Sequence, residues 1–147
     1  MGNRVDRRLR ASSRTANRSW YQVRNRADTS AEVFIYDEID SWWGVSAADF
    51  VRDLAALDVD AITVRINSPG GVVFDAIAIL NALRAHPARI TTVVDGLAAS
   101  AASVIAMAGD EIVMRPNAEI MVHEAWGIEI GDAEDMRRMA ERLDKDG

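Results

Sequence analysis

The stretch AITVRINSPGGVVFDAIAILNALRA, residues 61–85, decides the fold. Its first six residues are rich in β-branched side chains and predict a strand, and residues 74–85 predict a helix that ends before Pro87. Residues 89–95 (RITTVVD) predict the next strand. A strand, a helix and a strand in this order form a parallel pair with a right-handed crossover.

The flanking sequence continues this pattern in both directions. Upstream, residues 32–38 (EVFIYDE) predict a strand, a Trp-Trp-Gly loop follows at 42–44, and Ser46 caps a helix with Asp49 three residues on. Downstream we expect four further elements: a small-residue helix at 100–108, short strands at 111–114 and 119–124, and an amphipathic helix capped by Asp132. The whole predicts an α/β domain with a mainly parallel sheet.

Length and composition limit the possible classes of protein. The 147 residues are 49% hydrophobic and 27% charged, which is typical of one folded domain and excludes a disordered polyampholyte. Because the chain has no cysteine, disulfides, thiolate nucleophiles and cysteine-ligated metals are excluded. His86 and His123 are the only available imidazole ligands, and we expect neither a metal nor a cofactor.

Charge divides the chain near residue 26. Residues 1–26 hold eight arginines and one acid, a charge of +7, whereas residues 27–147 hold nine bases and 22 acids, a charge of −13. We therefore expect a basic, poorly ordered arm at 1–26 before a globular domain at 27–147. Contact of the arm with nucleic acid or an acidic partner is the alternative, although the acidic body argues against nucleic-acid binding.

Hydropathy argues against membrane insertion. The longest apolar stretch, residues 97–109, contains two serines and is too short to span a bilayer. The arginine-rich N-terminus lacks the apolar run of a secretory leader. We therefore expect a cytoplasmic protein.

Two loops that follow strands are candidates for chemistry, because ligands of open α/β sheets gather beyond the carboxyl ends of the strands. In residues 67–71 (NSPGG), Gly70 and Gly71 permit positive φ and the close approach of another backbone, which suits an oxyanion hole or a phosphate cradle. A plain strand-to-helix turn is the alternative. A P-loop and a dinucleotide fingerprint are excluded, since neither Gly-Lys-Ser/Thr nor a third glycine follows.

The second loop, residues 95–103 (DGLAASAAS), places Ser100 at the start of the small-residue helix, where the helix dipole favours a developing oxyanion. A helix cap is the commoner role for such a serine, and Ser103 is expected to face packing. A nucleophilic serine needs a base. His86 fits an exposed capping position, whereas His123 ends an apolar strand as either a satisfied structural histidine or a base. Together, the glycine pair, Ser100 and His123 form a coherent acyl-transfer set.

Three ordered motifs, RINSPGG at 65–71, DGLAAS at 95–100 and IMVH at 120–123, resemble those of the ClpP family of serine peptidases. The likeness is strongest to its phage branch, the head maturation (prohead) proteases, whose N-terminal strand and Trp-Gly loop are similar to residues 33–44. The resemblance extends from about Trp20 to the C-terminus. It implies a crotonase-like ββα superhelix, with a mainly parallel sheet and flanking helices, that assembles into homo-oligomeric rings.

The resemblance also implies roles for individual residues. Ser100 is the expected nucleophile and His123 the general base, with the backbone amides of Gly71 and Ala101 as oxyanion donors. The expected peptide-binding residues follow the same two motifs: Gly70, Val72, Val73, Phe74, Ala125 and Trp126. The implied activity is that of an ATP-independent serine endopeptidase that processes capsid or scaffold proteins in the host cytoplasm or the phage prohead.

One family feature has no counterpart in the sequence. The third catalytic residue of the family, an aspartate, lies well beyond the histidine, and only 24 residues follow His123. Asp132, Asp135 and Asp144 are interpreted as helix-surface or capping residues. We therefore expect a fragment that ends in or after the long handle helix, or an orienting group from elsewhere. A catalytically weak scaffold or assembly subunit of the same fold, and a crotonase-type acyl-CoA enzyme, remain alternatives.

Overall fold

Ten regular elements make up the described part of the computed structural model, which covers residues 19–27, 29–40, 46–124, 126–127 and 129–146. In chain order they are β1 (Tyr21–Ala27), β2 (Ser30–Ile35), α1 (Ala47–Ala55), β3 (Ala61–Ser68), α2 (Val73–Ala85), β4 (Arg89–Ala99), α3 (Ala101–Ala106), β5 (Glu111–Met114), β6 (Glu119–Met121) and α4 (Ala133–Asp146).

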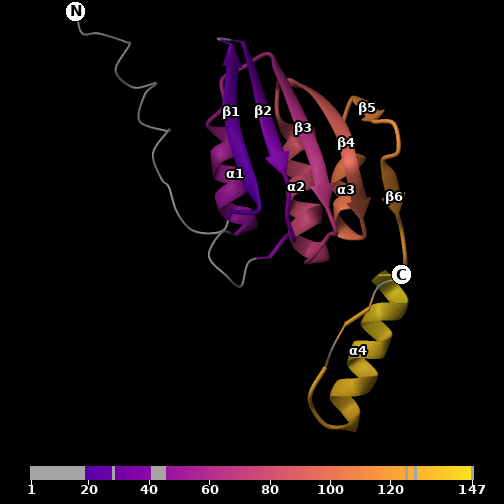
Figure 1. Cartoon of the computed structure of the whole chain (residues 1–147). Coiled ribbons are helices and arrows are strands. Elements are labelled where there is room, and N and C mark those ends of the chain that lie inside the picture. Colours follow the sequence, from indigo (N-terminus) through magenta and orange to yellow (C-terminus); the bar gives the residue numbers. More distant parts are fainter. Residues whose placement is uncertain (1–18, 28, 41–45, 125, 128, 147) are drawn as a thin grey trace, which may run out of the picture.

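The strands form one sheet in the order β1-β2-β3-β4-β5, and β6 also pairs with β4 (Figure 1). The pairing of β1 with β2 is antiparallel, and all the other pairings are parallel. The predicted α/β domain with a mainly parallel sheet and flanking helices is therefore confirmed.

Local sequence explains where α1 begins. Ser46 Oγ accepts a hydrogen bond from the Asp49 backbone N–H at 3.2 Å, and the Asp49 carboxylate accepts one from the Ser46 N–H at 3.1 Å. This reciprocal capping box satisfies two N–H groups that have no partner within the helix. The predicted helix start at Ser46 is therefore confirmed.

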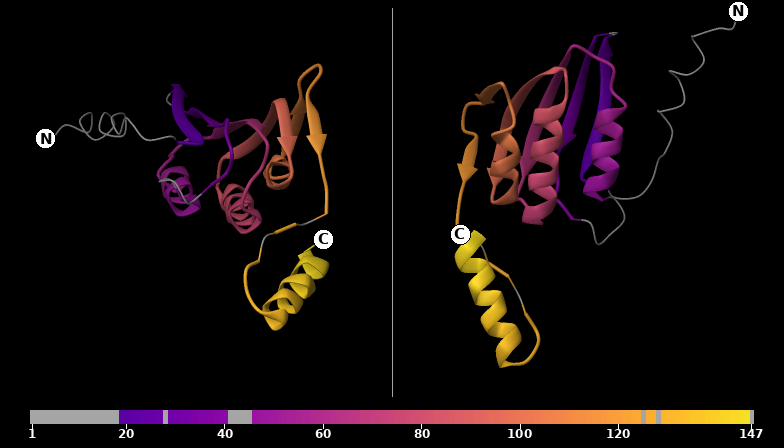
Figure 2. Two further views of the ribbon diagram at one scale, coloured as in Figure 1. Left: turned by 60° about the horizontal axis from the view of Figure 1, so that its bottom comes forward. Right: turned by 180° about the vertical axis from the view of Figure 1, so that it is seen from behind.

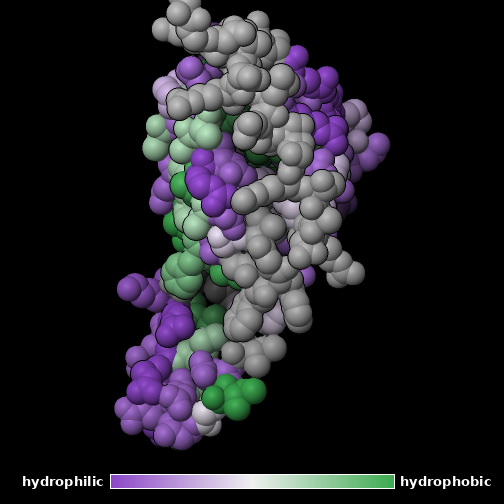
Figure 3. Space-filling view, turned by 90° about the vertical axis from the view of Figure 1, so that its left-hand side faces the viewer, coloured by the Kyte–Doolittle hydropathy of each residue, from purple (hydrophilic) through white to green (hydrophobic). Residues whose placement is uncertain are grey.

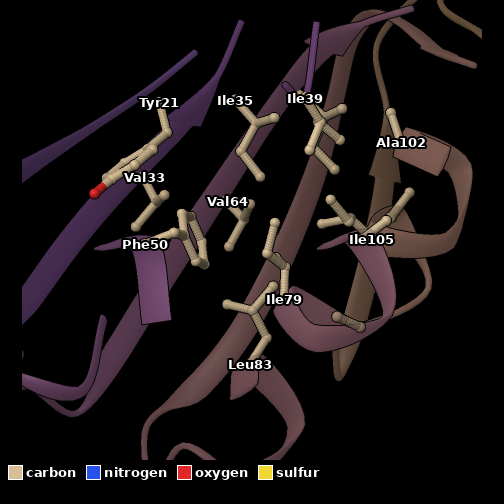
Figure 4. Packing of buried hydrophobic residues seen from close by; sticks show 14 of the residues in the cluster. Tyr21, Val33, Ile35, Ile39, Phe50, Val64, Ile79, Leu83, Ala102 and Ile105 are labelled. Carbon is tan, nitrogen blue, oxygen red and sulfur yellow. The ribbon is translucent and has the colours of Figure 1, made fainter. Parts of the chain in front are cut away.

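Helices α1, α2 and α3 cover the same face of the sheet, as the two views of Figure 2 show. The core lies between these layers, and in β3 every second residue from Ile62 to Ser68 is buried. Figure 4 shows strand and helix side chains meeting there. The fully buried members include Val33, Ile35, Val64 and Ile66 from the strands and Phe50, Ile79, Leu83 and Ile105 from the helices.

Strand β1 was not predicted, because the sequence analysis assigned residues 21–26 to the basic arm. Its first residue, Tyr21, is buried, stacks edge-on against Phe50 at a centroid distance of 5.0 Å and donates a hydrogen bond to Asp53 at 2.7 Å. Gln22 and Arg24 alternate with the inward residues and are exposed. Their polar side chains made this segment look like part of the basic arm rather than a strand. Residues 1–18 of the predicted arm lie outside the described residues.

Strand ends differ from the predictions at three places. β2 ends at Ile35 rather than at residue 38, and β6 ends at Met121 rather than at residue 124. β4 runs on to Ala99 rather than ending at residue 95, because its first half pairs with β5 and its last three residues pair with β6.

Helix α4 stands apart from the three helices that cover the sheet. It lies beyond the carboxyl ends of β3 and β4 (Figure 1), and the surface around it is mainly hydrophilic in the view of Figure 3. None of the helices in the described part of the chain has the length and apolar character needed to cross a bilayer.

Candidate active site

The glycine loop after β3 is packed tightly between two other segments. Gly70 has φ 101° and Gly71 has φ 148°, backbone conformations that favour glycine. A Cβ at Gly70 would lie 2.6 Å from the Ala99 carbonyl oxygen and 2.8 Å from Ser100 Cβ, and a Cβ at Gly71 would overlap the Ile39 carbonyl. The close backbone approach predicted for this glycine pair is therefore present.

Hydrogen bonds fix the direction of the loop amides. Ile39 donates to the Gly70 carbonyl at 2.7 Å and accepts from the Val72 N–H at 3.0 Å. The intervening Gly71 N–H therefore points away from Ile39, as in a parallel pairing. The Gly70 N–H donates to Ser68 Oγ, whereas the Gly71 N–H has no acceptor within the described residues.

Ser100 occupies a sharp turn between β4 and α3. Its φ of 52° and ψ of −125° are rare for a residue with a side chain, and its hydroxyl makes no capping hydrogen bond to the helix. The commoner capping role is therefore not adopted here. Strained turns of this kind cost about 1 to 3 kcal/mol and cluster at functional sites, and strand-turn-helix serines of hydrolases have such a conformation.

Ala101 is the first residue of α3 and is buried. Its backbone nitrogen lies 3.0 Å from the position of a Cβ on Gly70, so the glycine loop and the start of α3 are in contact. The Ala101 N–H finds no acceptor in the part of the chain that the structure describes. The amides of Gly71 and Ala101 thus both lack an acceptor among the described residues, on adjoining segments beside Ser100.

Ser103 has the packing role that its spacing predicts. It is buried, and its hydroxyl donates to the Ser100 carbonyl at 2.6 Å. This hydrogen bond stabilises the turn at Ser100. Ser103 is therefore a matched control for substitutions of Ser100.

Strand pairing brings the segment just before His123 beside Ser100. β6 runs parallel to β4 with Ala99 opposite Met121, and the Ser100 N–H donates to the Met121 carbonyl at 2.8 Å. His123 follows two residues later. The predicted strand end was wrong, because β6 stops before the imidazole, which is exposed and has no burial cost to offset.

The His123 ring contacts the main chain of the next residue. Its Nδ1 lies 2.5 Å from the Glu124 carbonyl oxygen. A carbonyl can only accept, so in the neutral ring Nδ1 carries the proton and Nε2 is left as the basic nitrogen. No hydrogen bond joins the imidazole to Ser100 Oγ in this structure.

His86 is structural and lies away from these loops, just before the first residue of β4. It is the C-cap residue of α2, in agreement with the predicted capping position, but it is half-buried rather than exposed. Its Nε2 lies 3.2 Å from the Leu57 carbonyl, and its Nδ1 accepts from the Ala88 N–H at 3.1 Å. Both ring nitrogens are therefore engaged by the backbone.

The residues expected to bind peptide lie on two segments beyond the carboxyl edge of the sheet. Val72 is the N-cap residue of α2, followed by the exposed Val73 and by Phe74, which is 63% exposed. Trp126, after β6, is 73% exposed, and Ala125 lies outside the described residues.

The acidic residues near α4 have the roles expected of them. Asp132 accepts from the N–H groups of Glu134 and Asp135 at 2.9 and 3.1 Å and so caps the helix, and Asp135 forms an ion pair with Arg138 on its surface. Asp144 is exposed. Within the described ranges, no group of three or more histidine or acidic side chains is arranged to hold a metal ion.

An ionic cluster beside the site was missed by the sequence analysis. On the sheet face opposite the helices, Arg65 binds both carboxylate oxygens of Asp95, at 2.8 and 2.5 Å, and Tyr36 donates to the same carboxylate at 2.6 Å. Burial acts to raise the pKa of Asp95, but the hydrogen bonds from Arg65 and Tyr36 outweigh it and hold the pKa below its usual value. A signal was present in the sequence, since Arg65 and Asp95 are charged residues that directly adjoin runs of β-branched residues, TV before Arg65 and TTVV before Asp95.

The fold and the arrangement of the three motifs define a ClpP-like α/β domain. The model of the family described as Clp protease matches residues 14–146. The chain belongs to the Clp protease family. The predicted family is thereby confirmed, whereas the phage branch is a matter for proposal.

Relatives and solved structures agree with this assignment. An ATP-dependent Clp protease proteolytic subunit of Leuconostoc citreum is 34% identical over 137 residues, which are 89% of this chain and 68% of the relative. Subunit 1 of the same protease from Shouchella clausii is 35% identical over 126 residues, 84% of this chain and 65% of the relative. The ClpP1 N165D mutant from Listeria monocytogenes superposes with a TM-score of 0.66 at 27% identity, over 78% of this chain and 64% of that chain. The chain thus spans about two thirds of the length of these proteins.

Proposed function

We propose that this chain is a serine-type endopeptidase in which Ser100 is the nucleophile and His123 the general base. The observation that carries the proposal is the conformation of Ser100. Its hydroxyl leaves the helix uncapped, its backbone is in a region that costs energy, and its Cβ lies against Gly70. A serine held in this way suits a role in chemistry rather than in stability.

The proposed reaction passes through an acyl-enzyme. Ser100 Oγ attacks the scissile carbonyl carbon while His123 Nε2 accepts the hydroxyl proton, and the imidazolium then gives this proton to the leaving amine. Water hydrolyses the ester by the same route in reverse order. The N–H groups of Gly71 and Ala101 stabilise the tetrahedral oxyanion, because neither is committed to an acceptor in the described chain.

The Glu124 carbonyl contributes to the orientation of the base. By accepting from Nδ1 it keeps Nε2 unprotonated, the function that an aspartate has in a complete triad. Because the carbonyl is uncharged, it stabilises the imidazolium less than a carboxylate does, and we expect slow turnover from the described residues alone.

An extended peptide is the proposed substrate. Phe74 and Trp126 present large exposed apolar side chains, with Gly70, Val72 and Val73 beside the first and Ala125 beside the second. Exposed apolar groups at the edge of a site provide contact area for substrate side chains.

The biological setting is proposed from the likeness of residues 33–44 to the phage head maturation proteases. In this setting the enzyme works without ATP in homo-oligomeric rings, processes capsid or scaffold proteins, and acts in the host cytoplasm or the prohead. Of the basic segment at 1–26, residues 21–26 belong to β1 and thus to the sheet of the peptidase domain.

A fluorophosphonate probe tests the catalytic proposal directly. It reacts with an activated serine hydroxyl, so the chain is expected to label covalently at Ser100. Labelling disappears in Ser100→Ala and persists in Ser103→Ala, and peptide mapping identifies the modified residue. Labelling of both variants, or of neither the parent nor the variants, contradicts the proposal. The second result favours a scaffold or assembly role, which the absence of a Ser100–His123 hydrogen bond would suit.

A further inference from the structure

Strand β4 contains a bulge just before the candidate nucleophile. β3 and β4 pair with a constant offset from Ala61 opposite Arg89 to Ile66 opposite Val94, and the next pair is Ser68 opposite Ala98. Residues 95–97 of β4 therefore face the single residue Asn67 of β3. Such a bulge interrupts the ladder and leaves backbone groups without their regular partner.

Asn67 provides the missing partner with its side chain. The Leu97 N–H donates to Asn67 Oδ1 at 3.1 Å. Within the described chain, no hydrogen bond involves the side-chain nitrogen of Asn67. The hydrogen bond to Leu97 therefore depends on the Oδ1 atom of Asn67 and not on its side-chain nitrogen.

Gly96 leaves room for this contact. A Cβ at Gly96 would lie 2.8 Å from Asn67 Oδ1, and this is the shortest distance to any atom near it. Its φ lies outside the positive range that favours glycine, since Gly70 and Gly71 are the described glycines with such values. The absence of a side chain at Gly96 thus serves the Asn67 side chain rather than the backbone conformation.

The bulge sets the position of the site. Leu97 comes three residues before Ser100, and Asn67 comes four residues before Gly71. After the Ser68–Ala98 pair that follows the bulge, the two chain segments remain in contact, since Gly70 lies against Ser100 and the Ala101 nitrogen. The offset at the bulge therefore determines how the Gly71 amide stands relative to Ser100 and Ala101.

We propose that Asn67 is a positioning residue, whose side-chain oxygen holds the β4 bulge so that the Gly71 amide, Ser100 and the Ala101 amide keep their catalytic arrangement. Its effect on reactivity rests on the proposed function, whereas its effect on the bulge does not. Asn67 does not itself touch the reacting atoms.

The first test compares Asn67→Ala with Asn67→Asp. Aspartate has the same shape and keeps the acceptor oxygen, so it is the conservative control. In kinetics with the fluorophosphonate, Asn67→Ala is expected to lower the maximal rate of Ser100 modification by about 10-fold or more, with the half-saturating probe concentration unchanged, because one hydrogen bond of this kind changes rates on this scale. Asn67→Asp stays within about threefold of the parent. Equal rates for parent and Asn67→Ala overturn the proposal, as does an equal loss in both variants.

The second test is a double-mutant cycle with Gly96→Ala. This substitution displaces the Asn67 side chain, so alone it is expected to reproduce the loss seen in Asn67→Ala. In the Asn67→Ala background it then has little further effect, because the side chain it would displace is already gone. If the fold-loss in rate of the double variant equals the product of the two single losses, the proposal is contradicted, since Gly96 would then act independently of Asn67.

Amide hydrogen exchange separates this proposal from the proposed function. The Leu97 N–H is expected to exchange about tenfold faster in Asn67→Ala and at the parent rate in Asn67→Asp, whether or not the chain reacts with the probe. If the parent fails to label and Leu97 still loses protection in Asn67→Ala, the peptidase proposal fails and the bulge contact stands. Unchanged Leu97 exchange in Asn67→Ala overturns the positioning proposal in either case.

Discussion

The two halves of the candidate site are held by the fold in different ways. Ser100 and the glycine pair lie between buried segments, with contacts to Ile39, Ala99 and Met121. His123 is exposed and follows a strand of three residues, and its ring hydrogen-bonds the carbonyl of the adjacent Glu124. The proposed nucleophile and oxyanion donors are therefore preorganised by this domain, whereas the proposed base lies on a segment that the domain holds at one end.

This difference has a physical origin. Burial and main-chain hydrogen bonds hold the backbone around Ser100 in one conformation. Its strained φ persists because the surrounding packing allows no alternative. An exposed side chain keeps its rotamer freedom, so its reactive geometry is populated for part of the time. The same contrast between firmly packed and exposed parts of the molecule is expected to govern what substitutions do to reactivity and stability.

Removal of the base is expected to have the largest effect. His123→Ala lowers the rate of Ser100 phosphonylation by about 10²- to 10⁴-fold, the usual contribution of a general base. Added imidazole restores part of the rate, because the exposed position leaves room for a small base. The control His86→Ala removes the other histidine without this loss. A His123→Ala chain that reacts like the parent would remove the base from the mechanism.

The core and α4 are expected to differ strongly in their contribution to stability. Phe50 is fully buried beneath the sheet, and Phe50→Ala is expected to cost about 3 to 5 kcal/mol of unfolding free energy. Met136 on α4 is 44% exposed, and Met136→Ala costs less than about 0.5 kcal/mol. Urea titration followed by circular dichroism measures both. Comparable losses would mean that α4 packs on the domain more than its exposure indicates.

The Arg65–Asp95 pair is expected to make stability depend on pH. The pKa of Asp95 is lowered in the folded state, so the pair stabilises the fold fully above the unfolded value of about 4, and the contribution is lost as the pH falls through the lower folded value. Asp95→Asn therefore costs about 2 kcal/mol near pH 7 and progressively less below about pH 4. The control Asp58→Asn removes an exposed carboxylate that has no ion pair in the described structure. A cost for Asp95→Asn that is independent of pH contradicts the assignment.

The strain at Ser100 is expected to have the smallest effect. Glycine adopts a φ of 52° without steric cost, so Ser100→Gly raises the unfolding free energy by about 1 kcal/mol while abolishing labelling. Ser100→Ala abolishes labelling without the gain, because alanine retains the Cβ. Thermal unfolding of the two variants measures the difference. Equal stability would show that the turn is not strained.

The fold was predictable from the sequence where apolar residues recur with a clear period. The β3–α2–β4 unit follows from residues 61–95, and Ser46 and Asp132 mark the starts of their helices. β1 was missed because Gln22 and Arg24 occupy its outward positions, so that only its inward residues carry an apolar signal. The polar composition of this segment therefore favoured a disordered arm, whereas pairing with β2 and burial of the inward residues make it a strand.

The sequence was enough to nominate the reactive residues of the candidate site, but not the residues that hold them in place. Residue type and loop position were enough to nominate Ser100 and the glycine pair, because their chemistry is local. Asn67 and the Arg65–Asp95 pair act across strands about 30 residues apart in the chain, and the bulge that aligns them is invisible without the register. The direction of the His123 ring likewise depends on where β6 ends.

A short turn also sets which residue follows the β6 segment that pairs beside Ser100. β6 is joined to β5 through Arg115–Ala118, which the Ala118 N–H closes onto the Arg115 carbonyl at 3.0 Å, and β6 pairs with β4 at three positions. One residue more or less in this turn shifts β6 by about 3.3 Å along β4. An insertion would then place the isopropyl group of Val122, and a deletion the carboxylate of Glu124, where the imidazole now stands. Under the proposed function, a change in the length of this turn is therefore expected to abolish labelling of Ser100 even though Ser100 and His123 themselves are unchanged.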